Sequence, residues 1–249
     1  MSDNDKAESK VLVLRTCDKD LRSYNDFTWP ASGHVECPDW SPTPTYGNGL
    51  HGLLWGTGDG ALLDWSSDAK WLVVEVLEDT IVKIGEGKVK FPKGNVIFCG
   101  SQLEATKMIY DRAPALFYGM GIVGFHLDVG HGQTAIAGDY GHATAGYKGT
   151  ATAGNYGVAT AGDSGTATAG AEGTATAGDY GHATAGDSGT ATAGDYGTAT
   201  AGAEGTISIK WWDSNAERYR LATGYIGENG LEANVPYKIE ENGKFIKVV

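Results

Sequence analysis

The sequence of 249 residues lacks the features that identify several common protein classes. Its three cysteines, Cys17, Cys37 and Cys99, are an odd number without a C-x-x-C spacing, so neither a disulfide framework nor a standard zinc site is indicated. No apolar run approaches the roughly 18 to 20 residues of a membrane helix. Residues 1–10 are charged, resemble no signal sequence and are expected to form a disordered tail. These absences predict a cytoplasmic protein with reduced thiols and no membrane contact.

Positive charge is also scarce. The chain has 19 lysines and arginines against 31 aspartates and glutamates, which gives a formal net charge of -12. Such a surface repels the phosphates of nucleic acids, so no nucleic-acid partner is expected. An acidic surface suits a basic protein partner better, and a flat repetitive surface also suits association with a second copy of the chain.

Glycine, in contrast, is abundant, with 38 residues against only 7 prolines. Most of these glycines lie in an eight-residue repeat, x-A-T-A-G-n-n-G, whose strict copies occupy residues 134–205. A degenerate copy precedes them at residues 126–133. A short, fixed period of this kind is typical of solenoids, whose coils stack on one another.

The repeat predicts a two-sided β-solenoid of 16-residue coils. Within x-A-T-A the side chains alternate, so alanine faces inward and threonine outward, and G-n-n-G forms a turn whose glycines accept positive φ. Two octads close one coil, and ten octads give about five coils. Leu127 and Val129 at the start, and Ile207 and Ile209 at the end, replace alanine where the solenoid meets its caps. The alternative, an antiparallel meander of four-residue strands, buries too little surface.

The rest of the chain predicts a mainly β protein with an α+β N-terminal domain and connector (residues 11–124), the solenoid (125–209) and a β-hairpin C-terminal cap (210–249). Ser101 and Glu104 fit a capping box, which places a helix over residues 102–112. The Asn242-Gly243 pair predicts a hairpin turn in the cap. The segment up to residue 52 is expected to be rich in loops. The other expected elements are a short helix at 59–65 and strands at 11–16, 71–77, 80–84, 88–91 and 96–99.

The repeat GDYGHATAGYKGTATAG and the ending WWD…RYR…GYIGENGLEANVPYKI resemble a family of uncharacterised phage and prophage proteins. Their N-terminal domain, a DUF7666-like domain of unknown function, carries a G-L-H segment that matches Gly49, Leu50 and His51. The resemblance covers nearly the whole chain. It implies an origin in a mobile element, a location in the host cytoplasm, and no established activity.

The turns of the repeat carry acidic and aromatic residues that favour a binding surface. The leading hypothesis is a non-enzymatic phage accessory protein whose rigid acidic solenoid binds a host protein, for example one involved in defence. Tyrosine is favoured at interfaces, although the tyrosines also suit a ladder on neighbouring turns and the acidic residues suit simple solvation. The candidate residues are Asp139, Tyr140, Tyr156, Asp163, Asp179, Tyr180, Asp195 and Tyr196.

The outward threonines form a second candidate surface. Assigning alternate octads to alternate faces puts three threonine pairs on one face, and Thr174/Thr176 and Thr190/Thr192 on the other. Flat Thr-x-Thr arrays resemble the ice-binding face of antifreeze solenoids, so ice binding is the first alternative function. Against it, threonine is also an ordinary soluble strand former, and Ile136, His142, Val158 and His182 interrupt the arrays. The three pairs are Thr150/Thr152, Thr166/Thr168 and Thr198/Thr200.

Histidines supply the remaining candidates. His142 and His182 are five octads apart, an odd number, so they fall on opposite faces and cannot share a metal. The segment around His51 resembles the histidine that opens the NAD site of ADP-ribosyltransferases, which makes an NAD-using enzyme the second alternative and His51 its weak catalytic candidate. The tyrosine and glutamate of such a site cannot be placed, and His51 also suits a histidine that a loop satisfies. No metal or cofactor is expected.

Overall fold

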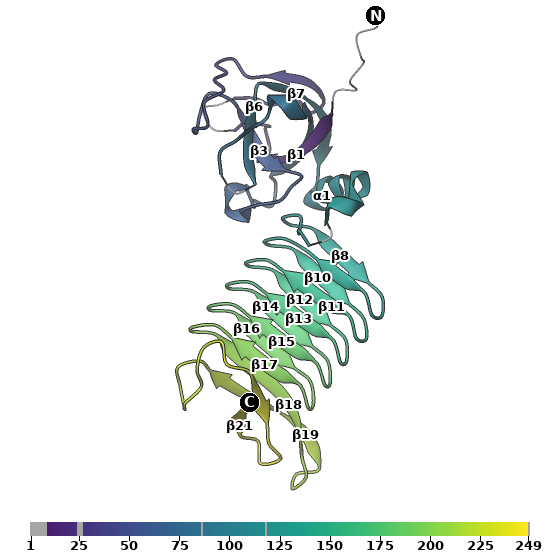
Figure 1. Ribbon diagram of the computed structural model, residues 1–249, viewed down its shortest axis with the longest axis vertical. Coiled ribbons are helices and arrows are strands. Elements are labelled where there is room, and N and C mark those ends of the chain that lie inside the picture. The colour runs from purple at the N-terminus through teal and green to yellow at the C-terminus, as the bar shows by residue number, and fades with distance from the viewer. Residues whose placement is uncertain (1–8, 24–26, 86, 118, 249) are drawn as a thin grey trace, which may run out of the picture. The chain divides into compact units, whose positions relative to one another are not determined.

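The computed structural model describes residues 9–23, 27–85, 87–117 and 119–248 (Figure 1). It divides into two compact units, Met1–Leu116 and Phe117–Val249. Residues 1–8 of the expected tail lie outside the described residues. Lys10 begins the first strand, and the carbonyl of Ser9 accepts a hydrogen bond from the backbone of Glu78 at 2.9 Å. Among the described residues, no helix has the length and apolar character needed to cross a membrane.

The first unit is built on an antiparallel sheet of seven strands in the order β2-β7-β4-β1-β3-β6-β5. Val11, Val13, Leu72 and Val74 lie on the two central strands, and their side chains pack in one buried cluster with Trp29. Alternation along the strands turns their neighbours to the other face. The bounds are β1 Lys10–Cys17, β2 Gly33–Glu36, β3 Leu50–Leu54, β4 Lys70–Leu77, β5 Val82–Lys83, β6 Lys88–Phe91 and β7 Lys93–Gly100.

Helix α1, Gln102–Arg112, packs against β1, β4 and β7. Its expected bounds and its capping box are both confirmed. The Ser101 hydroxyl accepts from the backbone of Glu104, and the Glu104 carboxylate accepts from the backbone of Ser101. Ala105 and Ile109 are fully buried on the face toward the sheet. The local capping signal therefore determined this element.

Other expectations for the first unit need correction. Two strands, β2 and β3, lie in the segment expected to be rich in loops. The helix expected at residues 59–65 is only the 3₁₀ turn Gly60–Leu62, and the strand expected at 80–84 is the 3₁₀ turn Glu78–Thr80 followed by the two-residue β5. These segments are short, so long-range pairing decided their conformation and local propensity did not.

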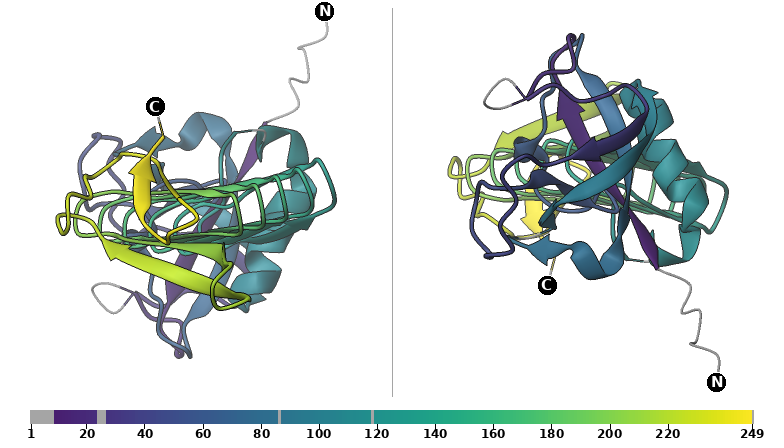
Figure 2. Two further views of the ribbon diagram at one scale, coloured as in Figure 1. Left: turned by 90° about the horizontal axis from the view of Figure 1, so that it is seen from below. Right: turned by 90° about the horizontal axis from the view of Figure 1, so that it is seen from above.

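The second unit contains the expected two-sided β-solenoid (Figure 1). Strands of successive coils pair in parallel and in register, as in His142 with Val158 and Thr150 with Thr166. Seen along the solenoid, the coils form a flat, narrow loop (Figure 2). We call the two layers sheet I and sheet II. Sheet I contains β8 His126–Val129, β10 His142–Ala145, β12 Val158–Ala161, β14 Thr174–Ala177, β16 Thr190–Ala193 and β18 Thr206–Asp213. Sheet II contains β9 Thr134–Ile136, β11 Thr150–Ala153, β13 Thr166–Ala169, β15 His182–Ala185 and β17 Thr198–Ala201.

Alanine side chains fill the space between the two sheets, as the repeat predicts. Every alanine of the x-A-T-A segments is at most 3% exposed. Ile207 and Ile209 are buried at the last coil, while Leu127 and Val129 pack against the core at the first. Because the core consists of methyl groups, the two sheets lie close together. In the middle coils the space between them does not accommodate a side chain larger than alanine.

The turns differ from the prediction in one important respect. No glycine within residues 138–205 has a φ in the left-handed region; instead, the residue before the last glycine of each turn does, for example Ser164 at 55° and Glu172 at 52°. The glycines are needed for space. A Cβ on Gly178 would lie 2.6 Å from the backbone nitrogen of Asp163 in the preceding coil. Close stacking of backbones, and not backbone conformation, therefore requires glycine at these positions.

Both ends of the solenoid are covered by other segments of the second unit. At the start, Ile122 and Phe125 are buried, and their carbonyls accept hydrogen bonds from the backbones of Gly138 and His142. Residues 117–124, expected in the N-terminal domain, thus belong to the second unit. At the end, β19 Arg218–Tyr225 pairs with β18, and the hairpin of β20 Tyr237–Ile239 and β21 Phe245–Lys247 pairs with β17. The cap does not start at residue 210, because β18 continues from the last coil into the hairpin.

Candidate functional site

The outward positions of sheet II form two columns of threonines. Parallel pairing in register places Thr150 beside Thr166 and Thr152 beside Thr168, at equivalent positions of adjacent coils. Eight of the ten outward positions on this sheet are threonine; the exceptions are Ile136 and His182. The structure therefore brings together the six threonines that octad counting had assigned to one face. These are Thr150, Thr152, Thr166, Thr168, Thr198 and Thr200, and all six are half-buried.

The threonine hydroxyls of sheet II are available to water. None of the six side-chain hydroxyls forms a hydrogen bond with another residue of the described part of the chain. Their backbones, however, are held on both sides by the parallel ladder, as in Thr166 to Gly149 at 2.9 Å. The face is thus a rigid grid of methyl and hydroxyl groups with unused hydrogen-bonding capacity.

The outward face of sheet I is less regular. His126, Asp128, His142 and Val158 occupy outward positions of its first three strands. At its other end, a hollow of about 420 Å³ lies between Thr192 and the β18–β19 hairpin. Sheet I therefore has threonine pairs only at Thr174/Thr176 and Thr190/Thr192, and the hollow adjoins the second pair at Thr192.

The acidic turn residues hold the coils together. Asp163 Oδ1 accepts the backbone N–H of Asp179 at 2.9 Å, and Asp179 Oδ1 accepts that of Asp195 at 2.8 Å. On the opposite edge, Asp139 bonds the backbone of Asn155 in the same way at 2.8 Å. Asp179 also pairs with Lys210 at 2.7 Å, and this ion pair, followed by the Asp195 N–H, holds the pKa of the Asp179 carboxyl below its usual value. These carboxylates form a ladder between turns.

The candidate tyrosines stack in pairs on the two edges. The rings of Tyr140 and Tyr156 are 4.9 Å apart and nearly parallel, and those of Tyr180 and Tyr196 are 5.2 Å apart. The Tyr156 hydroxyl donates to Glu172 at 2.7 Å, which raises the pKa of Tyr156. Tyr156, Tyr180 and Tyr196 are exposed, up to 72% for Tyr196, while Tyr140 is half-buried. The ladder that the sequence allowed is therefore present as two short stacks.

His142 and His182 lie on sheets I and II respectively, so they are on opposite faces. The ring of His142 contacts that of His126 in the degenerate first octad, with ring centroids 4.3 Å apart. This contact was not predicted from the sequence. Burial, followed by the nearby His142, lowers the pKa of His126. Within the described ranges, no group of three His, Cys, Asp or Glu side chains is arranged to hold a metal ion.

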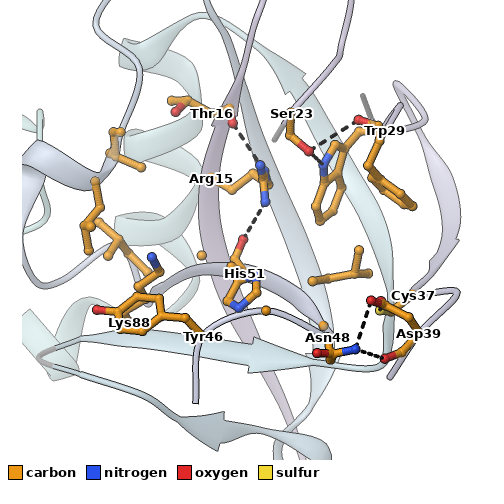
Figure 3. A pocket seen from close by; sticks show the side chains of 18 of the residues that line it. Arg15, Thr16, Ser23, Trp29, Cys37, Asp39, Tyr46, Asn48, His51 and Lys88 are labelled. Carbon is orange, nitrogen blue, oxygen red and sulfur yellow. Dashed lines mark hydrogen bonds between the residues drawn. The ribbon is translucent and has the colours of Figure 1, made fainter. Parts of the chain in front are cut away.

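In the first unit, His51 lines a cavity of about 670 Å³ (Figure 3). It lies on strand β3 and not in a loop, because Gly52 allows β3 to approach β1 closely; a Cβ there would lie 2.6 Å from the carbonyl oxygen of Leu14. The Arg15 guanidinium donates to the His51 carbonyl at 2.9 Å. The His51 Nε2 atom is buried and has no hydrogen-bond partner among the described residues, so the loop does not satisfy this histidine as expected.

Positive charge dominates the surroundings of His51. Burial, then the charges of Lys88, Arg15 and Lys90, lowers its pKa from 6.5 to about 4, so the imidazole is neutral at pH 7. Among the described residues that line the cavity, Asp39 is the only carboxylate, and no glutamate is present. For the alternative of an NAD-using enzyme, the structure thus provides a cavity around His51, but no glutamate is among the described residues that line it.

Sequence reasoning found the threonine faces but missed the cavity. Its walls come from segments far apart in the chain, including Arg15 on β1, Trp29, Tyr46 and Lys88 on β6. The one available signal was the group of aromatic residues in the first 50 positions, which had no clear periodicity. Only the pairing of β1 with β3 and of β3 with β6 brings these residues around His51.

The chain is similar to proteins named ice nucleation protein. One from Xanthomonas campestris pv. translucens is 42% identical over 106 residues, which cover 42% of this chain and 7% of that protein. InaU of Pantoea ananas is 41% identical over 103 residues (41% and 10%), and a Pseudomonas syringae protein is 43% identical over 104 residues (41% and 9%). The matched segments therefore span a tenth or less of these relatives. No solved structure matches the chain.

These relatives correct the leading functional hypothesis. A phage accessory protein with an acidic solenoid that binds a host protein was the wrong expectation, because similarity to ice nucleation proteins favours the ice-binding alternative. The expected DUF7666 domain, in contrast, is confirmed, since residues 11–109 match the family described as a domain of unknown function. The chain thus combines a DUF7666 domain with a segment similar to ice nucleation proteins.

Proposed function

We propose that the solenoid binds ice through the outward face of sheet II. The observation that carries this proposal is the pair of threonine columns, in register over adjacent coils and with free hydroxyls. Strand spacing sets the columns' repeat at about 4.8 Å along the solenoid, and the spacing within a strand is about 6.6 Å across it. A regular grid of this kind orders a layer of water, because each hydroxyl can both donate and accept.

Rigidity supports the same function. A surface that binds an ordered lattice must hold its groups in place before binding, since ordering flexible side chains costs free energy. β-Branched threonine has few rotamers, and the ladder fixes its backbone. Five strands of three or four residues give sheet II an outward area of about 300 Å².

The relatives named ice nucleation proteins support this proposal, and we infer that the similarity lies in the repeat. Nucleation requires an ordered water cluster of critical size, which becomes larger as supercooling becomes milder. An array of five coils is small for that purpose. We therefore expect binding to existing ice crystals as the activity of the described solenoid.

Two matched variants test the proposal. Thr168→Lys places a charged side chain at the centre of the sheet II face, and Thr176→Lys makes the same change on sheet I. We expect inhibition of ice recrystallisation, and thermal hysteresis, for the parent chain and for Thr176→Lys, but not for Thr168→Lys. Circular dichroism checks that both variants fold. A folded parent chain without either effect at high concentration contradicts ice binding, and equal loss in both variants contradicts the choice of face.

The expectations of a protein partner, of a cytoplasmic location and of a phage or prophage origin stay predictions. Ice binding through sheet II depends on none of them.

A further inference from the structure

The cavity beside His51 has an unusual charge for this protein. The chain as a whole has a net charge of -12, yet two cationic side chains, Arg15 and Lys88, line the cavity. Its one carboxylate among the described residues, Asp39, already accepts hydrogen bonds from the Asn48 amide at 3.0 Å and from the Cys37 thiol at 3.0 Å. Positive charge is therefore in excess inside the cavity.

Neither cation forms an ion pair with a carboxylate among the described residues. No carboxylate of the described residues lies within 4.0 Å of Arg15 or Lys88. Arg15 donates instead to two backbone carbonyls, those of His51 at 2.9 Å and Thr16 at 3.2 Å, which orient the guanidinium but do not neutralise it. Burial and the nearby Arg15 both lower the pKa of Lys88. Two partly desolvated cations near each other are unfavourable unless an anion binds between them.

Aromatic rings provide a second kind of surface. The Arg15 guanidinium lies 4.4 Å from the ring centre of Trp29, and the Lys88 ammonium 4.5 Å from that of Tyr46 (Figure 3). Phe27 adds a further ring to the lining. The cavity volume of about 670 Å³ is in the range of small-molecule sites. The buried Nε2 of His51, which has no partner among the described residues, lies at the same place, and buried polar atoms without a partner are few in native proteins.

We infer that this cavity binds a small organic anion, which places a carboxylate or phosphate group between Arg15 and Lys88 and an aromatic or apolar body against Trp29, Phe27 and Tyr46. Both cations form strong hydrogen bonds with either anionic group. This binding site belongs to the DUF7666 domain and does not depend on ice binding by the solenoid.

The test uses three probes with one aromatic body: benzoate, phenyl phosphate and the neutral benzyl alcohol. Calorimetric titration of the full chain is expected to show binding of at least one anion and at least about tenfold weaker binding of benzyl alcohol, because the alcohol cannot form charge-assisted hydrogen bonds. Comparison of benzoate with phenyl phosphate identifies which anionic group the site prefers. Tryptophan fluorescence gives an independent signal, since Trp29 lines the cavity.

Lys88→Gln and Lys83→Gln each remove one positive charge, but Lys83 is exposed on β5 and does not line the cavity. Lys88→Gln is expected to weaken anion binding by about tenfold or more, Lys83→Gln by less than about twofold, and Lys88→Arg to retain it. Folding of each variant is checked by circular dichroism, and Lys88→Arg provides the comparison if Lys88→Gln is unstable. Absence of anion binding at millimolar concentration, equal affinity for benzyl alcohol, or equal weakening by Lys83→Gln overturns the inference.

Discussion

Substituting Gly178 by alanine tests why the repeat needs its glycines. The glycine-rich turn suggests positive φ, but in the structure the left-handed residue of the turn between β12 and β13 is Ser164, with φ 55°. A Cβ on Gly178 would meet the Asp163 backbone of the preceding coil, with 2.6 Å to its nitrogen and 2.8 Å to its Cα. Ordinary contact begins near 3.4 Å, so the two coils must separate by about 0.8 Å at this turn.

That separation weakens two hydrogen bonds between coils. The Gly178 N–H donates to the Ala161 carbonyl at 3.1 Å, and the Asp179 N–H donates to Asp163 Oδ1 at 2.9 Å. Each is worth about 0.5 to 1.5 kcal/mol net. Replacing glycine also restricts the unfolded chain, which offsets about 0.4 to 1 kcal/mol. We therefore expect Gly178→Ala to destabilise the middle coils by about 1 to 2 kcal/mol.

Ser164→Gly is the matched control, in the turn of the preceding coil on which Gly178 stacks. Glycine removes the strain of a left-handed non-glycine residue, and its greater freedom in the unfolded state costs a similar amount, so we expect a change below about 0.5 kcal/mol. Hydrogen–deuterium exchange of peptides from the middle coils measures both variants locally. Exchange is expected to become about 5 to 30 times faster in Gly178→Ala and to stay near the parent value in Ser164→Gly.

The reasoning is refuted if Gly178→Ala exchanges like the parent chain. It is equally refuted if Ser164→Gly is the more damaging substitution, since close stacking would then not explain the glycines.

Three further predictions concern charges and packing. The pKa of His51 is about 4 in the folded protein and 6.5 in the unfolded chain, so between these pH values only the unfolded state binds the extra proton. The first unit should therefore lose at most about 3 kcal/mol of stability as pH falls from 6.5 to 4. Urea titrations at each pH measure this slope, and His51→Gln should remove it. Lys210→Met should raise the pKa of Asp179, which NMR titration of its carboxyl measures. It should change the free energy of unfolding by less than about 1 kcal/mol, because both side chains of the pair are more than a third exposed. Since the pKa of Asp179 is depressed in the folded protein, this small contribution is present above the pKa of the unfolded chain and is lost as pH falls through the folded pKa. Ala175→Ile should destabilise the solenoid by about 1 to 3 kcal/mol or more, because Ala175 is fully buried between two close sheets, and a thermal melt like that of the parent chain would contradict a methyl-filled core.

The sequence alone predicted most of the solenoid. A period of eight residues with alternating alanine and threonine determines which side chains face inward, and the parity of the octads determines which sheet each joins. The assignment of Thr150 and Thr166 to one face and of His142 and His182 to opposite faces follows from counting. Such arguments work because every contact in a solenoid is with the neighbouring coil.

Local signals also predicted helix α1, because its capping box involves residues only three apart. They failed for β2 and β3, whose strands are short and depend on partners distant in the chain. The function also needed more than the sequence pattern. Acidic turns and stacked tyrosines fitted a protein-binding edge, and only the comparison with relatives favoured the threonine face over it.

The repeat by itself thus determined the coil, its two faces and its alanine core, because each depends on periodicity. Tertiary structure decided the rest. The stacking distance between coils decided that glycine is required for space at Gly178, and the conformation of the turn made Ser164 its left-handed residue. In the first unit, pairing of strands far apart in the chain brought Arg15 and Lys88 to one cavity beside His51. No local pattern encodes such a meeting, because it depends on sheet order and not on spacing along the chain.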